Sequence, residues 1–338
     1  MKRAAVRAVL CIGHVLVAIL ILSAQQPWKD PTKHTVQFVT VDQGVRLEVL
    51  DWGGHGRPVV LLTGSGHTAH VYDEFAPKLT DCCHVYGITR RGFGASTRPP
   101  SGYDDQRLAD DVFHAIDEAK IAKPVLIGHS MAGGEMTTLG RQHSDRVSGL
   151  VYLDAIADLE DDPPADKEWA ALQAKMPAGL TPHPVCDPVD TSSFAAFRRT
   201  RTCPMEFTLP ESEFHQQFED MNGRVGAPTA PDWVMRSIGQ QQVFRKDYSN
   251  IQVPVLVLLP KTEIDYQPKT DEERVLIDHF IARGEVVIGR WIAKVKRGVP
   301  DARVIYIPRG GHYLWATKEA DVLREIHAFI ANLPRPGQ

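Results

Sequence analysis

Short, continuous apolar runs recur along the chain and limit its fold more than any other feature. They are Val59–Leu62, Val85–Ile88, Val125–Ile127, Leu150–Leu153, Val255–Leu259 and Val304–Ile307. A strand is apolar along its whole length when helices cover both sides of its sheet. Helical patterns lie between the runs, and the clearest places Leu108, Val112 and Ile116 on one stripe. This alternation predicts an α/β fold with a doubly wound, mostly parallel sheet.

Two further patterns extend this sheet and interrupt it. Alternating residues at 36–39 and 45–49 surround Asp42, Gln43 and Gly44, which predicts an antiparallel hairpin at one sheet edge. Buried-strand patterns stop between 158 and 249, where proline, charge and scattered aromatics are frequent. We therefore expect residues 158–249 to form an inserted helical cap, with the core divided between 34–157 and 250–335. A last helix, carrying Val322, Ile326, Phe329 and Ile330, ends before Pro334.

The composition of the chain favours a globular protein that acts on small molecules. Its 338 residues are 43% hydrophobic and carry a formal net charge of −4. Acidic and basic residues alternate without a long run of Lys or Arg, so we expect no nucleic-acid partner. The oligomeric state is left open.

The N-terminus has the charge and hydropathy pattern of a targeting segment. Lys2, Arg3 and Arg7 precede an almost unbroken apolar run over residues 8–24. A positive end followed by an apolar stretch is typical of secretory signals, and this run is also near the shortest length that spans a bilayer. Residues 1–24 therefore predict a signal peptide or a membrane anchor. The expected location is periplasmic or extracellular, either released or held at the membrane.

Four cysteines follow this segment. Cys82 and Cys83 are adjacent and are expected to be small buried residues at the start of a strand rather than a pair joined to each other. Cys186 and Cys203 lie in the expected cap, where an oxidising compartment would favour a disulfide over two free thiols. No cysteine spacing resembles a zinc motif, and no metal is expected.

A serine lies where a buried strand pattern meets a helical one. The segment Val125–Gly133 reads VLIGHSMAG, with Ser130 between the apolar run and the helix. Such a turn requires small residues on either side of the serine, and Gly128, Ala132 and Gly133 supply them. It exposes the serine hydroxyl at a helix N-terminus, which makes Ser130 the candidate nucleophile.

These residues make the chain resemble the α/β-hydrolase superfamily, in its capped, serine esterase-like form, from about Val36 to Leu333. Thr63-Gly64-Ser65-Gly66 looks like the loop after the third strand, which implies that the Ser65 amide is one oxyanion-hole donor. Arg90-Arg91-Gly92-Phe93-Gly94-Ala95-Ser96 is similar to the loop after the fourth strand. Ser130 matches the nucleophile, Met131 the second oxyanion donor and His312 the general base. A serine becomes nucleophilic when an adjacent imidazole takes its proton.

The acid of the triad has two main candidates and one outsider. Glu263 lies where relatives carry the acid after the seventh strand, but Pro260 and Lys261 replace the usual turn there. Asp154 ends the preceding strand, at a position similar to the one that some relatives use. We favour Asp154, with Glu263 as the alternative and Asp265 behind both.

The resemblance implies a serine hydrolase that cleaves an ester, or else an amide, of a small to medium apolar substrate without any cofactor. The alternatives are a cofactor-independent perhydrolase or acyltransferase, and a ligand-binding protein with little turnover. His67 is expected to be a solvated loop residue rather than a substrate contact, and His129 to form local contacts. The expected cap carries six large aromatics that could line an acyl pocket or form its own core: Trp169, Phe194, Phe197, Phe207, Trp233 and Phe244.

Overall fold

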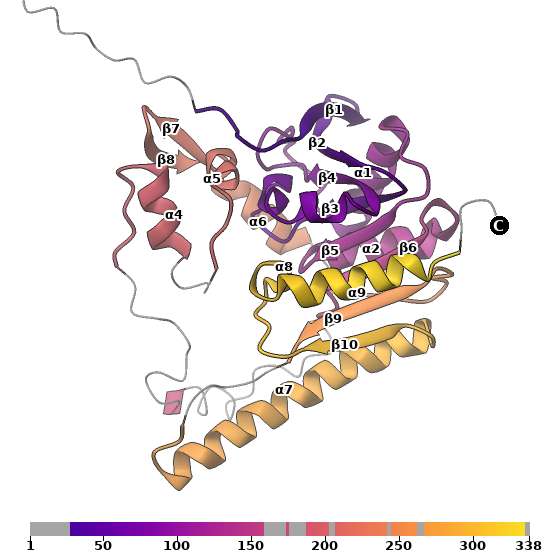
Figure 1. Ribbon diagram of the computed structural model, residues 1–338, viewed down its shortest axis with the longest axis vertical. Helices are drawn as coiled ribbons and strands as arrows, with labels where there is room; N and C mark the ends of the chain where they lie inside the picture. The colour runs from indigo at the N-terminus through magenta and orange to yellow at the C-terminus, as the bar shows by residue number, and fades with distance from the viewer. Residues whose placement is uncertain are drawn as a thin grey trace, which may run out of the picture.

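An eight-stranded sheet forms the centre of the computed structural model (Figure 1), which describes residues 28–158, 174–175, 187–202, 207–241, 245–261 and 267–334. In spatial order the strands are β1 (Thr35–Asp42), β2 (Val45–Gly54), β4 (Cys83–Thr89), β3 (Arg57–Leu62), β5 (Val125–His129), β6 (Gly149–Leu153), β9 (Val255–Pro260) and β10 (Arg303–Ile307). β1 pairs antiparallel with β2, and β2 antiparallel with β4, whereas all remaining pairs are parallel. The predicted edge hairpin and mostly parallel sheet are confirmed.

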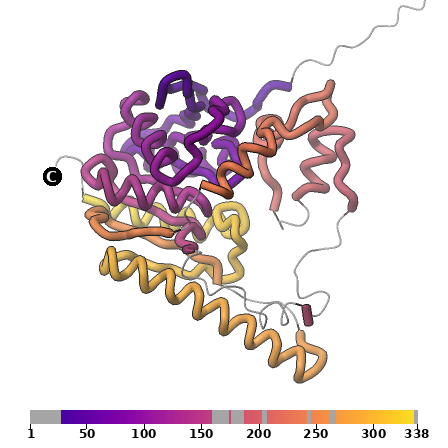
Figure 2. Tube along the Cα trace, turned by 180° about the vertical axis from the view of Figure 1, so that it is seen from behind, coloured from indigo at the N-terminus to yellow at the C-terminus, as the bar shows by residue number. Residues whose placement is uncertain are grey.

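Helices cover both faces of this sheet, as the continuous apolar strands require. Side chains alternate between the faces, so that Leu61 belongs to one apolar cluster and its neighbour Leu62 to the other. The first face packs against the short helices η1 (Ala69–Tyr72) and η2 (Ala76–Leu79), α8 (Leu314–Thr317) and α9 (Glu319–Ala331). The second face packs against α1 (Asp105–Glu118), α2 (Ala132–Gln142) and the C-terminal half of α7 (Asp271–Gly298), as the view from behind shows (Figure 2).

The long helix α7 is an element that the sequence analysis missed. Its N-terminal half extends past the sheet (Figure 1), and the only buried side chains along its 28 residues are Ile277 and Val295. Val275 and Val286 are 68% and 55% exposed, so apolar residues do not gather on a single stripe. The capping residue Thr270, which accepts a hydrogen bond from the Glu273 amide, was the clearest available signal for its start.

The insertion between β6 and β9 contains more than helices. It comprises α4 (Phe194–Thr202), α5 (Glu211–Gln217), the strands β7 (Phe218–Met221) and β8 (Arg224–Pro228), and α6 (Asp232–Gln241). The two strands form an antiparallel hairpin through Asn222 and Gly223, whose φ angles are 59° and 85°. Asn-Gly is the strongest short signal for such a turn, yet the strands are too exposed to show a buried-strand pattern.

The cysteines give one correction, and two regions lie outside the described residues. Cys82 and Cys83 form a disulfide with each other, contrary to the expectation of two separate buried residues. Cys82 belongs to the turn before β4 and not to the strand, so the two side chains do not point to opposite faces.

The proposed signal or anchor at 1–24 and the cysteines 186 and 203 are not described. Within the described ranges, no helix is both long and apolar enough to cross a membrane.

A buried ion pair joins the loop after β4 to α1. The Arg91 side chain is 2% exposed, and its Nη2 donates to Asp111 Oδ1 over 2.6 Å. We expect Asp111→Ala to lower the free energy of unfolding by about 3–5 kcal/mol, because it leaves a buried guanidinium without its partner. Asp110→Ala, one residue earlier, removes only an exposed hydrogen bond and should change the same quantity by less than about 0.5 kcal/mol. Urea unfolding of both variants measures the difference, and equal losses would contradict this account.

Candidate active site

Ser130 lies on a sharp turn between β5 and α2. Its φ angle is 53°, a left-handed conformation that is strained for a residue with a side chain. The turn depends on close approach of its neighbours. A Cβ at Gly128 would stand 2.1 Å from Met136 Sδ, and one at Gly133 would stand 1.8 Å from the Ala155 carbonyl oxygen. Only glycine therefore fits at these two positions without a shift of the surroundings.

The structure brings Ser130, His312 and Asp154 together from three separate elements. His312 follows β10, Asp154 follows β6, and both lie at the edge of the sheet where β5 ends. Ser130 Oγ is 3.0 Å from His312 Nε2, and His312 Nδ1 is 2.6 Å from Asp154 Oδ2. The imidazole can thus accept the serine proton at one nitrogen while it donates to the carboxylate at the other. Glu263 and Asp265, the competing acids, lie outside the described residues.

The expected oxyanion loop passes close to Ser130. A Cβ at Gly64 would stand 2.6 Å from His129 Nδ1 and 3.3 Å from Ser130 Cβ, so little room separates this loop from the serine turn. Ser65 is exposed and Met131 caps α2. Neither of their amides donates a hydrogen bond to another described residue.

Buried hydrogen bonds from Arg90 hold this loop in place. The Arg90 side chain is 4% exposed and pairs with Glu135 of α2 over 2.6 Å. The same guanidinium donates to the carbonyls of Thr63 and Gly64 over 2.8 and 3.4 Å. Burial raises the pKa of the Glu135 carboxyl. The positive charge of Arg90 acts in the opposite direction and lowers this pKa. Arg90 thus connects α2 to the loop after β3.

His129, the residue before Ser130, contacts both the backbone and the ring of His312. Its Nε2 lies 3.0 Å from the His312 carbonyl oxygen, and the two rings are 4.4 Å apart. Burial, together with the nearby His312 and His67, holds the pKa of His129 well below its ordinary value. The ring is therefore neutral, with its proton on Nε2 donated to that carbonyl. His129 positions the His312 backbone, a contact between residues far apart in the sequence and not the local contact expected.

His67 is buried, contrary to the expectation of a solvated loop residue. Its Nδ1 lies 2.9 Å from Glu213 Oε1 of α5, and its Nε2 lies 3.0 Å from the Tyr313 hydroxyl. Glu213 also accepts from the Thr68 amide over 3.0 Å and from Gln217 over 2.7 Å. Burial and the nearby Glu213 raise the pKa of Tyr313. Glu213 could not be singled out in the sequence, because its partners come from distant segments.

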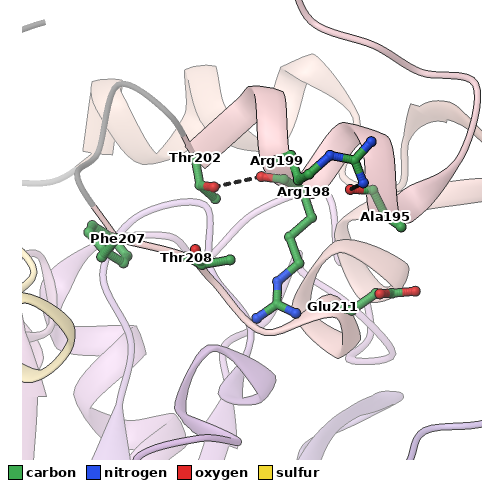
Figure 3. Close-up of a pocket in the computed structure, with 7 residues that line it drawn as sticks. All are labelled: Ala195, Arg198, Arg199, Thr202, Phe207, Thr208 and Glu211. Atoms are coloured by element: carbon green, nitrogen blue, oxygen red, sulfur yellow. Dashed lines mark hydrogen bonds between the residues drawn. The ribbon is translucent and has the colours of Figure 1, made fainter. Parts of the chain in front are cut away.

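A cleft of about 660 Å³ opens in the insertion between α4 and the segment before α5 (Figure 3). Its lining includes Arg198, Arg199, Phe207 and Glu211. Phe207 packs against Tyr313, the residue after His312, with ring centroids 4.8 Å apart. The other described aromatics of the insertion do not line this cleft: Phe194 and Phe197 belong to the main core, and Trp233 packs near Tyr103. Trp169 and Phe244 are not described.

Side chains spaced like metal ligands occur elsewhere in the described part of the chain. One group consists of Asp30, His34, His70 and Asp73, and the other of Asp81, Cys82 and His327. Neither group includes a member of the Ser130 site, whose groups are suited to acyl transfer through protein side chains alone.

Comparison with known proteins identifies the family. The model of the "Alpha/beta hydrolase family" matches residues 59–325. The chain belongs to this family. The sheet of this family, with the strand order and serine turn already described, is therefore the scaffold of the site.

Individual relatives resemble parts of this hydrolase or its whole fold. The chain is 33% identical over 114 residues to epoxide hydrolase A of Mycobacterium tuberculosis, which is 32% of this chain and 35% of that protein. It is 30% identical over 125 residues to the bifunctional esterase/perhydrolase DCH of Acinetobacter calcoaceticus, covering 36% and 45% of the two chains. These matches thus span less than half of either relative. The solved structure of E-2-(acetamidomethylene)succinate hydrolase has a TM-score of 0.61 at 19% identity, over 88% of this chain and 99% of that one.

The neutral state of His129 makes the stability of this hydrolase depend on pH. Unfolding restores the ordinary pKa of about 6.5, so below that pH the unfolded chain binds a proton that the native chain does not. Stability is therefore lost as the pH falls below about 6.5, by about 1.4 kcal/mol between pH 7.5 and 5.5 from this residue alone.

The variant His129→Gln keeps an N–H donor for the His312 carbonyl and cannot titrate. We expect its free energy of unfolding to fall by about 1.4 kcal/mol less than that of the wild type between pH 7.5 and 5.5. Urea unfolding at the two pH values measures this difference. His114→Gln, a change at an exposed histidine, serves as the control and should leave the wild-type dependence in place. Identical pH dependence in wild type and His129→Gln would show that His129 is protonated in the native state.

Proposed function

We propose that this protein is a serine hydrolase that cleaves an ester through an acyl-enzyme intermediate. One observation carries the proposal: Ser130, His312 and Asp154 form a continuous chain of hydrogen bonds of 3.0 and 2.6 Å at the serine turn. A serine, an imidazole and a carboxylate in this order are the groups that activate a hydroxyl for attack on an acyl carbon.

The proposed reaction has two halves, and His312 Nε2 takes and returns one proton in each. As Ser130 Oγ attacks the carbonyl carbon, His312 Nε2 takes the serine proton. The bond to the alcohol oxygen then breaks as His312 donates this proton to it, and the acyl group stays on Ser130. In the second half a water molecule, deprotonated by the same nitrogen, attacks the acyl carbon, and His312 returns that proton to Ser130 Oγ as the acid leaves. Asp154 keeps the imidazole in the required tautomer and stabilises its positive form.

The amides of Ser65 and Met131 are the proposed donors to the oxyanion. The charge that develops on the carbonyl oxygen requires donors already in place, and losing one typically costs about 10²–10³ in rate. Support comes from the narrow space between Gly64 and the serine turn, and from the guanidinium of Arg90, which donates to the carbonyls of the same loop. This loop is thus held before a substrate arrives.

The chemistry of the nucleophile separates this proposal from other hydrolases. An epoxide hydrolase would need a carboxylate at the position of Ser130, so likeness to epoxide hydrolase A does not carry that activity over. An amide remains the second choice of substrate. A perhydrolase is the alternative with a specific support, since one relative is named a bifunctional esterase/perhydrolase. It would use the same acyl-enzyme with hydrogen peroxide in place of water.

The aromatic surroundings of His312 support a small to medium apolar group on the substrate. The Tyr313 ring lies 5.4 Å from that of His312, and Phe207 from the insertion packs onto Tyr313 with ring centroids 4.8 Å apart. The proposed location is outside the cytoplasm, released or anchored, and it rests on the apolar segment 8–24 that follows Lys2, Arg3 and Arg7.

The first test removes the nucleophile. We expect Ser130→Ala to lose labelling by a fluorophosphonate and to lower turnover of a short-chain aryl ester on the order of 10⁶-fold. Its fold should persist, because His312 is the one hydrogen-bond partner of the serine hydroxyl among the residues that the structure describes. Ser144→Ala, at a second serine next to the same helix, is the matched control and should still be labelled. Near-native turnover by Ser130→Ala would exclude the proposal.

The second test compares the two acids. We expect Asp154→Asn to lower turnover about 10⁴-fold with little loss of stability, because an amide of the same shape leaves the imidazole in the wrong tautomer. Glu263→Gln should be close to wild type in the same ester assay. A nearly unchanged Asp154→Asn beside a strongly impaired Glu263→Gln would assign the acid to Glu263 instead.

A further inference from the structure

A second group of ionisable side chains lies beneath the N-terminal segment, outside the Ser130 site. Asp30 and His34 precede β1, whereas His70 and Asp73 belong to η1 and its C-terminal end. The side chains of His34, His70 and Asp73 are 4%, 3% and 1% exposed, and that of Asp30 is 21% exposed. One oxygen or nitrogen atom from each of the four lies within 4.8 Å of the corresponding atoms of the others.

The spacing of these atoms matches the ligands of a tetrahedral ion. His70 Nδ1 is 3.2 Å from both Asp30 Oδ2 and Asp73 Oδ2. In a tetrahedral zinc site with bonds of about 2.0–2.1 Å, neighbouring ligand atoms stand about 3.3–3.4 Å apart, close to these two distances. His34 is the fourth candidate ligand and would use one of its two nitrogens: Nδ1 is 3.1 Å from Asp73 Oδ1, and Nε2 is 3.7 Å from Asp30 Oδ2.

Hydrogen bonds within the group leave two atoms unsatisfied. Asp30 Oδ2 and His34 Nδ1 are both buried, and neither has a hydrogen-bond partner. His34 Nδ1 lies 3.1 Å from Asp73 Oδ1, but without the alignment of a hydrogen bond. A buried polar atom without a hydrogen-bond partner is destabilising, and a bound metal ion would satisfy it.

The surrounding side chains hold the four candidate ligands in place. Glu48 Oε1 lies 3.5 Å from His70 Nε2, where a carboxylate typically accepts the second N–H of a metal-bound imidazole. Asp73 accepts from Trp52 Nε1 over 3.0 Å and from the Ser212 hydroxyl over 2.5 Å. With described residues, the ion pairs of Asp30, Asp73 and Glu48 are all with histidines. Three buried or half-buried carboxylates therefore surround two imidazoles.

We propose that Asp30, His34, His70 and Asp73 form a structural site for one Zn²⁺ ion. Two neutral imidazoles and two carboxylates are donors that zinc accepts in four-coordinate geometry, and the imidazoles disfavour Mg²⁺ and Ca²⁺. The two carboxylates balance the charge of the ion. Bound there, zinc fixes the N-terminal segment to η1 and, through the Asp73–Ser212 hydrogen bond, steadies helix α5 of the insertion.

The test uses the untagged full-length chain, stripped with a chelator and reloaded with Zn²⁺ alone. We expect one zinc per chain by mass spectrometry, and a rise in melting temperature on reloading. Asp30→Asn is the sharpest variant, because its Oδ1 can still accept the Thr32 amide, as Asp30 Oδ1 does over 2.8 Å. It and His34→Gln should each weaken zinc binding by at least about 100-fold, more than the loss of an outer hydrogen bond costs.

The matched control is His84→Asn. His84 also pairs with an aspartate, Asp51, over 2.9 Å, but no second histidine is near it in that pair. It should bind zinc as the wild type does. Absence of zinc in the reloaded wild type, or wild-type affinity in both Asp30→Asn and His34→Gln, would overturn the proposal. Loading the wild type with Co²⁺ in place of Zn²⁺ gives a readout that needs no variant. A visible absorption spectrum typical of octahedral rather than tetrahedral Co²⁺ would also overturn the proposal.

Discussion

The carboxyl-end edge of the parallel sheet is the constraint on which the rest of the structure depends. Parallel strands all end at the same edge, so residues that follow β5, β6 and β10 meet there although the sequence separates them widely. Ser130, Asp154 and His312 each follow one of these strands. Ser130 and Asp154 share a left-handed φ, at 53° and 46°, since each turns the chain sharply out of its strand. The two anchoring hydrogen bonds, from the Ser130 amide to Leu153 and from the Asp154 amide to Leu258, tie each turn to the next strand.

The sequence predicted those parts of the fold and site that depend on local patterns. Apolar runs found the central strands because these strands are buried on both faces, and the serine turn was recognisable from Gly128 and Gly133. Asp154 could be selected only because it ends a strand at a position similar to the one that some relatives use for their acid. The hairpin β7–β8 and the long helix α7 were missed because both are largely exposed, and hydropathy carries little information where no face is buried.

What the sequence could not predict is the set of contacts between distant polar residues. Glu213 is fully buried, and His67 is only 7% exposed. The two residues come into contact only because the insertion packs against the core, and no local sequence pattern shows this. The group around His70 shows the same limit. Asp30 and His34 are four residues apart, and His70 and Asp73 are three apart, so each pair alone resembles many other pairs of charged residues. Only the packing of the N-terminal segment on η1 joins them.

Two polar contacts attach α5 to the core, and they start from adjacent residues. Ser212 bonds to Asp73 in the proposed zinc site, and Glu213 bonds to His67, which in turn contacts Tyr313 beside the catalytic base. A seven-residue helix has little intrinsic stability, so its position depends on such contacts. Fixing Asp73 therefore also restrains Glu213, and with it the hydroxyl of Tyr313. The position of the insertion and the geometry around His312 are therefore linked through Ser212 and Glu213, two adjacent residues of α5.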